Sequence, residues 1–327
     1  MKTTRPPKPG GGFDATTEAR QHDVAYARTR PNYGRLLLGA LILLVGVKLA
    51  WLLIANPNFE WAVAGKYLNE KTVISGLMMT LGLTVVAMII GVFLGLMLAM
   101  AKISDNAMLR AVSVLYIGFF RGTPLLVQLL FWYNLSTLFP KIILGIPFGP
   151  DLLSWNTNDL ITPLTAAIVG LALNEAAYMA EIIRAGLISV DSRQMETAQA
   201  FGMTRSRALW RIVIPQAMRS IVPPTGNQLI SMVKATSMVS VIAMGDLLHA
   251  VQNIYNATFQ VIPLLLVAVI WYLAITTVLN IGQSAIERYY ARGELGSPAP
   301  RKKRWFGKAP AQSPDTSPAL SLQEVQS

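Results

Sequence analysis

The chain has 327 residues, of which 53% are hydrophobic, and its mean hydropathy of +0.45 is high for a soluble protein. It contains no cysteine and only two histidines, which excludes disulfides, thiolate metal sites and cysteine nucleophiles and argues against a histidine-rich metal site. The formal net charge is +11, but the basic residues lie between and beyond apolar blocks, not in a stripe interleaved with aromatic residues, so nucleic-acid binding is not expected.

The N-terminal region, residues 1–35, is rich in Pro, Gly, Thr and Arg and lacks apolar periodicity, so we expect a disordered tail. The first apolar block, residues 36–54, approaches the roughly 20 residues that a helix needs to cross a bilayer. A polar stretch of more than thirty residues precedes this block. We therefore interpret the block as a retained membrane helix and not as a cleaved signal peptide.

The next two apolar blocks each contain a distinctive local sequence. Residues 73–100 include G-V-F-L-G from Gly91 to Gly95, a spacing of small residues that permits close packing against another helix. Residues 111–139 are interrupted by the sequence R-G-T-P at residues 121–124, and proline destabilises a helix interior. A membrane tolerates a broken helix where protein buries it or where it lines a cavity. A loop rich in Pro and Gly follows at residues 140–150.

Three further apolar blocks, residues 161–188, 225–244 and 261–286, complete a set of six, and the tail 288–327 is again expected to be disordered. Of the 28 Lys and Arg residues, 22 lie in the two tails and in the loops on one side of the membrane, and 3 lie in the loops on the other side. The positive-inside rule therefore predicts that both termini are cytoplasmic. The expected fold is an all-α polytopic membrane protein with six transmembrane helices.

The polar segment 191–220 lies between the fourth and fifth blocks and has a regular pattern. Asp191 or Ser192 can cap a first short helix, and Thr204 can cap a second. A glycine between them suits a tight turn because it has no Cβ. Such a pair of short helices can dock into a groove on a cytoplasmic partner. The pattern reads E-x-A, three residues, Gly, nine residues, I-x-I-P, and its key residues are Glu196, Ala198, Gly202, Ile212 and Pro215.

This pattern resembles the EAA loop of the binding-protein-dependent ABC importer permeases. The resemblance implies that residues 191–220 form a coupling loop that an ATPase subunit pushes. Thr197 stands where the family usually has Ala, and Ile214 where it usually has Leu, and both changes are conservative. The sequence has no G-x-x-x-x-G-K-[ST] phosphate loop, so ATP and Mg²⁺ are expected on a partner chain and no cofactor on this one. An ordinary amphipathic loop is the alternative.

Polar residues inside the apolar blocks are the candidates for a substrate path, because ionisable groups at membrane depth are costly and usually functional. Asn174, Tyr178 and Glu181 follow helical spacing and share one face. Gln128 follows Arg121 by seven residues and is expected on its face. The full set of candidates is Arg121, Thr123, Gln128, Asn174, Glu175, Tyr178, Glu181, Lys234 and Ser237.

The charges of these candidates suit a zwitterionic substrate. We expect Arg121 or Lys234 to meet a carboxylate, and Glu175 or Glu181 to meet an amino group. The alternative is interhelical pairing that only holds the helices together. In particular, a glutamate at position 181 and an arginine at 184 can form an i,i+3 pair near the end of the helix.

The segments R-G-T-P-L-L-V-Q, N-E-A-A-Y-x-x-E-x-x-R and K-A-T-S-M-V-S are similar to the polar amino acid subfamily of these permeases, which includes histidine, glutamine, glutamate and arginine importers. The resemblance covers residues 73–287, the five-helix core of a type I ABC importer permease, and leaves residues 36–72 as an extra helix and a periplasmic linker. It implies a bacterial inner-membrane location. It further implies an ABC ATPase dimer, a second permease chain, identical or homologous, and a periplasmic solute-binding protein as partners.

Two other functional classes are alternatives to this interpretation. An ion-coupled secondary transporter of a small polar solute would be expected to have an internal repeat and its own ion site, and the sequence has no clear repeat. A membrane-embedded enzyme would need a metal cluster or a nucleophile constellation, and neither is evident in the sequence. The chain is therefore expected to be non-catalytic, with the secondary transporter as the main alternative.

Overall fold

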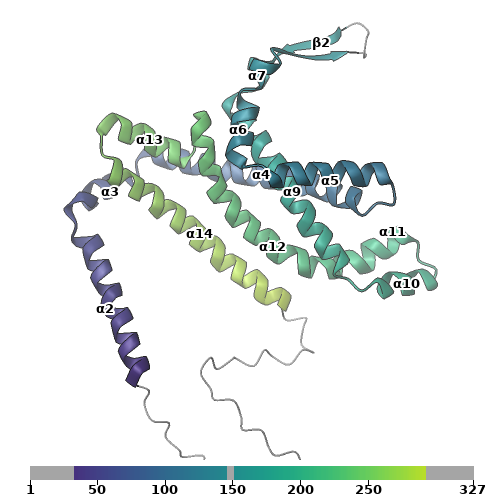
Figure 1. The fold of residues 1–327 in the computed structure, drawn as a ribbon, viewed down its shortest axis with the longest axis horizontal. Coiled ribbons are helices and arrows are strands. Elements are labelled where there is room, and N and C mark those ends of the chain that lie inside the picture. The colour runs from purple at the N-terminus through teal and green to yellow at the C-terminus, as the bar shows by residue number, and fades with distance from the viewer. Residues whose placement is uncertain (1–32, 146–150, 292–327) are drawn as a thin grey trace, which may run out of the picture.

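The computed structural model describes residues 33–145 and 151–291. Of the predicted disordered tails, residues 1–32 and 292–327 lie outside the described residues, whereas residues 33–35 and 288–291 are helical because α2 and α14 extend beyond the predicted apolar blocks. Within the described ranges, four helices are long and apolar enough to cross a membrane, and two bent helix pairs raise the number of possible spans to six. Figure 1 shows these helices in an elongated bundle, with helix α2 standing apart from the others.

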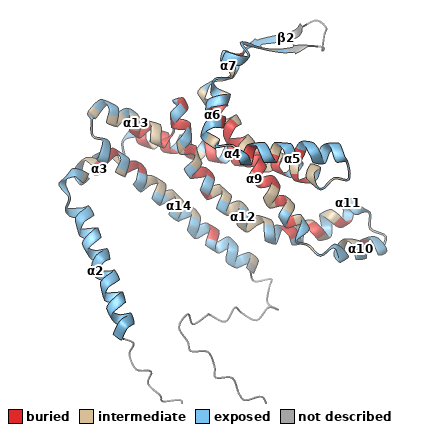
Figure 2. Cartoon of the chain, in the orientation of Figure 1, coloured by how far each residue is buried: buried red, intermediate tan, exposed pale blue. Residues whose placement is uncertain are grey.

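Helix α2 (Tyr33–Ala55) is the extra N-terminal helix that the sequence predicted. None of its residues is buried by the rest of the described chain, as its uniform pale blue colour in Figure 2 shows. The short helices η1 (Pro57–Phe59) and α3 (Trp61–Tyr67) connect it to the bundle. An apolar helix exposed on all sides needs lipid or another membrane helix around it.

Helices α4 (Lys71–Lys102) and α9 (Pro163–Ile188) form the centre of the bundle. Their close approach depends on the predicted small residues: a Cβ on Gly91 would lie 2.6 Å from Cγ of Glu175, and a Cβ on Gly95 would lie 2.6 Å from Cβ of Met179. Buried aliphatic residues such as Leu171 complete this core. The prediction of a closely packed face on the second span is confirmed.

The predicted break in the third span is also present. Helix α5 (Ala107–Gly122) ends at an extended Thr123, and helix α6 (Leu125–Tyr133) leaves at an angle of 102°. The expectation that Gln128 continues the face of Arg121 was wrong, because this bend interrupts the helical spacing on which it depended.

The chain that follows α6 contains a hairpin that the sequence did not predict. The short helix α7 (Leu135–Leu138) leads into strands β1 (Lys141–Gly145) and β2 (Asp151–Asn156), which pair antiparallel with Ile142 opposite Trp155. The hairpin projects away from the bundle (Figure 1). Helix α8 (Thr157–Leu160) then leads into α9.

The fifth span differs from its predicted bounds. Helix α12 (Ile214–Ala235) begins eleven residues before the predicted Thr225. Prolines disfavour a helix interior, but Pro215 lies in the first turn of α12, where proline is tolerated, and packing against α9 supports the rest of the helix. A 3-10 helix, η3 (Thr236–Ile242), and helix α13 (Leu247–Thr258) follow, with a bend of 46° between them. Helix α14 (Val261–Ala291) is the predicted sixth span.

A second packed cluster joins α13 and α14 to α3 and α4. Leu247, Val251 and Leu264 are completely buried in it. Asp246 caps α13 by accepting hydrogen bonds from the backbone N–H groups of Leu248 and His249. This cluster lies at the end of the bundle opposite the polar segment 191–220.

Candidate functional site

The coupling loop, residues 191–220, folds as two short helices joined at a glycine. Asp191 caps helix α10 (Ser192–Ala200) by accepting from the backbone N–H of Arg193 at 3.0 Å. The side chain of Arg193 also donates to this carboxylate and thereby holds the pKa of Asp191 below its usual value. Ala198 is buried, whereas Glu196 is exposed on the outer face of the helix.

Gly202 makes the turn between the two helices. Its φ is +81°, a left-handed conformation that glycine adopts without steric cost, and its N–H donates to the carbonyl of Gln199 at 2.9 Å. Thr204 then caps helix α11 (Arg205–Ala208) through the N–H of Arg207. The capping roles and the tight turn expected from the sequence are therefore confirmed.

The second half of the loop passes through the π-helical turn η2 (Leu209–Val213) directly into α12. Ile212 is half-buried, and Pro215 is exposed in the first turn of α12. Sequence reasoning did not single out Phe201 and Trp210, whose side chains are 86% and 66% exposed. The signal that could have indicated them is a large aromatic residue one position before Gly202 and another two positions before Ile212. Exposed aromatic residues of this kind are typical anchors for a protein partner.

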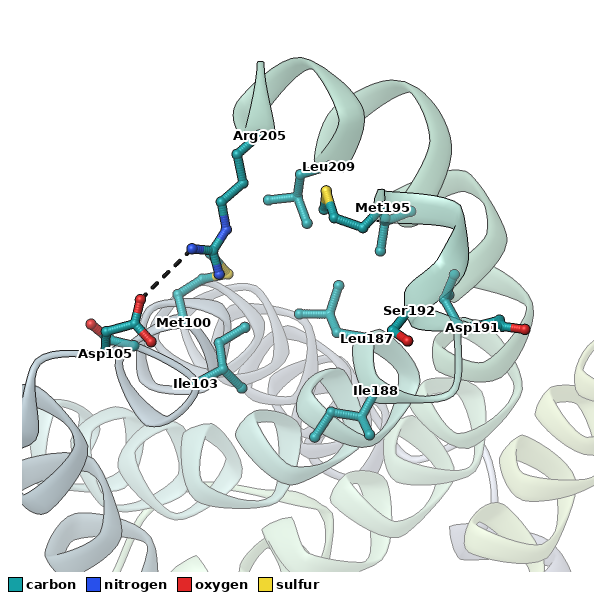
Figure 3. A pocket seen from close by; sticks show the side chains of 13 residues that line it. Met100, Ile103, Asp105, Leu187, Ile188, Asp191, Ser192, Met195, Arg205 and Leu209 are labelled. Atoms are coloured by element: carbon teal, nitrogen blue, oxygen red, sulfur yellow. Dashed lines mark ion pairs between the residues drawn. The ribbon is translucent and has the colours of Figure 1, made fainter. Parts of the chain in front are cut away.

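A groove of about 570 Å³ separates the coupling loop from the ends of α4 and α9 (Figure 3). Apolar side chains such as Met100, Leu187 and Leu209 line its interior. At its rim the guanidinium of Arg205 lies 3.7 Å from the carboxylate of Asp105, which belongs to the turn between α4 and α5. Both side chains of this pair are largely exposed, so the pair adds little stability.

The broken third span brings three of the candidate path residues together. The amide nitrogen of Gln128 donates to the hydroxyl of Thr123 at 2.7 Å and to the carbonyl of Phe120 at 3.0 Å. The amide nitrogen of Asn174 donates to the side-chain oxygen of Gln128 at 3.1 Å. These bonds satisfy backbone groups that the break leaves without helical partners.

Arg121 and Lys234 are exposed on the surface of the chain. The guanidinium of Arg121 lies 5.2 Å from the ring centre of Tyr178, a cation–π contact. Lys234 lies near the end of α12, and among the described residues no side-chain partner of its ammonium group is found. Ser237 donates to the backbone carbonyl of Lys234 at 2.7 Å.

Glu175 is buried between α4, α9 and α12, with 1% of its surface exposed. One carboxylate oxygen accepts from the amide of Gln228 at 3.0 Å, and the other has no hydrogen-bond partner among the described residues. Gln228 was not among the candidates. Gln228 lies inside the predicted fifth span, residues 225–244, so its polar side chain within an apolar block was the signal that could have indicated it.

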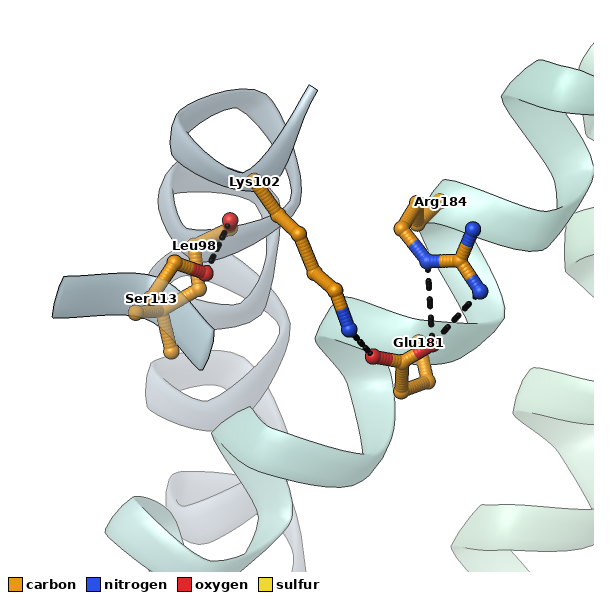
Figure 4. Close-up of polar contacts among 5 residues, drawn as sticks. All are labelled: Leu98, Lys102, Ser113, Glu181 and Arg184. Carbon is orange, nitrogen blue, oxygen red and sulfur yellow. Dashed lines mark hydrogen bonds and ion pairs between the residues drawn. The ribbon is translucent and has the colours of Figure 1, made fainter. Parts of the chain in front are cut away.

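Glu181 lies near the coupling-loop end of α9 and meets two cations there (Figure 4). One carboxylate oxygen pairs with Lys102 at the end of α4, and the other accepts from Arg184 at 2.8 Å. The anionic charge of Glu181 is therefore already balanced inside the chain. This geometry favours the interhelical alternative for Glu181, and Lys102 is a partner that the sequence did not reveal.

The charged candidates Arg121, Glu175, Glu181 and Lys234 do not come together in either of the two grooves described for this chain. A second groove of about 650 Å³ runs between α4, α9 and α12, and apolar side chains such as Val92, Met179 and Leu229 form almost all of its wall. None of the four charged candidates lines either groove. Among the described residues, no group of three or more His, Asp and Glu side chains could hold a metal ion.

Comparison with known proteins identifies the family. The family described as "Binding-protein-dependent transport system inner membrane component" matches residues 91–292, which is more than half of the chain and includes the whole coupling loop. The chain belongs to this family. The resemblance inferred from the EAA-type pattern is thereby confirmed.

Individual members of the family agree with this assignment. The arginine transport system permease protein ArgU of Corynebacterium glutamicum is 41% identical over 264 residues, 80% of this chain and 81% of that protein. The probable amino-acid permease protein YxeN of Bacillus subtilis is 37% identical over 218 residues, 66% of this chain and 90% of that protein. A crystal structure of an amino acid ABC transporter with histidines has a TM-score of 0.59 and 38% identity, and covers 70% of this chain and 98% of its own.

These similarities, together with the apolar helices, make the chain a multi-pass membrane permease of the type I ABC importer class. The relatives are transport subunits, which agrees with a role outside catalysis. The family match includes the whole coupling loop, which is the part of the candidate site that the sequence described most completely.

Proposed function

We propose that the chain is the permease subunit of an ATP-driven importer of polar amino acids, with arginine as the first substrate to test. The observation that carries the proposal is the exposed coupling loop, because a transporter driven by its own ion gradient has no need of a docking element for a motor. The names of the relatives support an amino acid as substrate. The buried carboxylate of Glu175 supports a substrate with an amino or guanidinium group.

The partners follow from this assignment. An ABC ATPase dimer would grip the coupling loop from the cytoplasm, where the positive-inside rule places both termini. A periplasmic binding protein would deliver the amino acid at the opposite end of the bundle, and a second permease chain would complete the path. The exposed Arg121 and Lys234 support such a second chain, because charges at membrane depth normally face protein or water.

ATP and Mg²⁺ belong to the ATPase, and this chain holds no cofactor in the proposed mechanism. Its own residues provide the gated path. Closure of the ATPases would move the coupling loop, and α12, which continues directly from that loop, would carry the movement towards Lys234 and Ser237. Arg121 and Glu175 are the proposed contacts for the carboxylate and the amino group of the substrate.

The test is uptake of radiolabelled arginine into proteoliposomes that contain the permease, its ATPase and its binding protein. Uptake is expected only when ATP is present on the side of the membrane to which the ATPase is bound. Uptake driven by an ion gradient with no ATPase present would overturn the proposal in favour of a secondary transporter. Glu175→Gln and Arg121→Gln are expected to raise the apparent KM, and an unchanged KM in both would end the proposed substrate site.

Docking of the ATPase is tested separately by co-purification. Gly202→Trp places a large side chain in open space at the tip of the coupling loop, where it is expected to block the ATPase. Gly65→Trp controls for the bulk of the new side chain, because position 65 is equally open but lies in α3, at the other end of the bundle, and Gly202→Ala controls for the strain of a side chain at the left-handed φ of +81°. Retention of the ATPase by the Gly202 variant would argue against docking at this loop.

A further inference from the structure

Helix α12 has a weak point, the turn at residues 223–224, which lies between the coupling loop and the proposed path residues Lys234 and Ser237. Pro223 and Pro224 lie inside the helix, and proline has no backbone N–H to donate. The carbonyl groups of Arg219 and Ser220, four residues earlier, therefore lack their helical hydrogen bonds. Two such losses in succession make this turn the easiest place in α12 to bend.

Gln283 of α14 is inserted at this weak point. Its side chain is 5% exposed, and its amide nitrogen donates to the carbonyl of Pro223 at 2.7 Å and to the carboxylate of Glu287 at 3.0 Å. A Cβ at position 226 would lie 1.6 Å from the side-chain oxygen of Gln283. The absence of a side chain on Gly226 therefore creates the space that the glutamine occupies.

The lower segment of α12, residues 214–222, precedes the prolines and packs against α9. A Cβ on Gly186 of α9 would lie 2.3 Å from Cγ1 of Ile221, so the two helices touch closely there. The hydroxyl groups of Ser189 and Ser220 are 3.0 Å apart at the same contact. The segment before the prolines thus packs on α9 and continues from the coupling loop, α9 also meets the segment beyond them through Glu175 and Gln228, and Gln283 connects the proline pair to α14.

The contact made by Gln283 is incomplete. Its side-chain oxygen is buried and has no hydrogen-bond donor among the described residues. A buried acceptor without a donor weakens the state that contains it. The contact is therefore weaker than one in which both the nitrogen and the oxygen of the amide are hydrogen-bonded.

We propose that Gln283 is a positioning residue that locks α12 across Pro223 and Pro224, so that movement of the coupling loop reaches Lys234 and Ser237. Without the lock, the lower segment bends at the prolines and moves alone. The ATPase then completes its cycle while the upper part of the path stays still. This inference rests on the proposed ATP-driven transport and adds a residue that determines how tightly the two processes are coupled.

The test uses the complete reconstituted transporter and measures the number of ATP molecules hydrolysed for each amino acid transported. Gln283→Met keeps the length of the side chain and removes the donor. It is expected to raise this ratio about five- to tenfold, the effect of losing one net hydrogen bond, while ATPase binding and hydrolysis persist. Gln252→Met in α13 is the control for the same chemical change and should leave the ratio unchanged.

Two combined variants separate locking from packing. Gln283→Met with Pro223→Ala and Pro224→Ala restores the helical donors, so a lock is no longer needed and the ratio should return towards that of the wild type. Gly226→Ala with Gln283→Ala removes the glutamine side chain and fills part of its space with a methyl group, without restoring a hydrogen bond. The ratio of ATP hydrolysed to amino acid transported should therefore stay high. A normal ratio in Gln283→Met, or in the Gly226→Ala pair, would overturn the proposal.

Assembly and the proposed function have their own readouts. If Gln283→Met fails to assemble, the triple variant still decides: tight coupling supports the lock, and an assembled but uncoupled transporter overturns it.

The native chain has no cysteine, so spin labels at Arg219→Cys and Ser231→Cys report the bending of α12 directly. A broader distance distribution with Gln283→Met is expected, and an unchanged one contradicts the lock. Failure of wild-type ATP-driven uptake would instead reject the proposed function.

Discussion

Gly91 of α4 lies directly against Glu175 of α9, because a Cβ on the glycine would come within 2.6 Å of Cγ of the glutamate. The contact encloses a carboxylate between two helices and leaves it facing Gln228 of α12 at 3.0 Å. The small residue that permits close packing is therefore also the residue that positions the most deeply buried acidic side chain of the candidate site.

Gly91→Ala is expected to separate α4 from α9 and to displace Glu175. Overpacking of this kind lowers the free energy of unfolding by about 1–3 kcal/mol. Gly82→Ala, on the same helix, meets no atom within 4 Å and should be neutral or stabilising by up to about 1 kcal/mol through helix propensity. Denaturant unfolding of the detergent-solubilised proteins, followed by helical circular dichroism, compares them. Equal stabilities would contradict the close contact.

Lys102→Met is expected to destabilise the bundle because it leaves Glu181 with Arg184 as its single cation at this site. The Lys102 and Glu181 side chains are 24% and 17% exposed, so the loss should be about 1–2 kcal/mol, between the values for exposed and buried pairs. Lys102→Met combined with Glu181→Met should cost less than the two single changes added together. Strictly additive losses in this double-mutant cycle would show that the pair is not coupled.

Gly202→Ala is expected to weaken the turn of the coupling loop without disturbing the bundle. The space around position 202 is open, so the cost comes from the left-handed backbone and amounts to roughly 1–2 kcal/mol. Gly202→Asn should be tolerated better, because asparagine enters this conformation more readily. Hydrogen exchange at the amides of α10 and α11 measures the effect. Identical exchange in the Ala variant and the wild type would be the contrary result.

The cap of α10 is expected to weaken in acid. Arg193 lowers the pKa of Asp191 below its ordinary value of 3.8, so the folded state binds this proton less readily than the unfolded state. The stabilisation is therefore present above pH 3.8 and is lost as the pH falls through the lowered pKa of the folded state. Because the pair is exposed, added salt should reduce the effect.

Asp191→Asn tests this dependence, because asparagine also caps helices but carries no charge. The variant is expected to show exchange protection of α10 that does not change over the same acidic range. Arg193→Met should keep the cap but raise the pH at which protection declines towards the ordinary value for aspartate. A wild-type loop whose protection is independent of acid would show that the carboxylate contributes nothing as an anion.

Several features could be predicted because their causes are local. The break at Pro124 follows from a missing backbone N–H, and the turn at Gly202 follows from a missing Cβ. Asp191 and Thr204 cap helices through their own side chains. The family resemblance was also readable, because the pattern of the coupling loop lies within one continuous segment.

Pairing between distant residues could not be predicted in this way. Lys102 and Glu181 are 79 residues apart in the chain, and Gln128 and Asn174 are 46 apart. Hydropathy shows that each span is apolar, but it does not show which helix faces pack against one another. The early start of α12 was missed for the same reason, since its prolines are disfavoured locally and its support comes from α9 and α14.

The sequence by itself therefore determined the membrane class, the break at Pro124 and the coupling loop with its two caps, all of which depend on neighbouring residues. Only the tertiary structure decided that Glu181 is neutralised by Lys102, that Glu175 is enclosed beside Gly91, and that Gln283 reaches Pro223. The physical reason is that helix packing sets the distances between side chains on different helices, and these distances determine which charges and donors can meet.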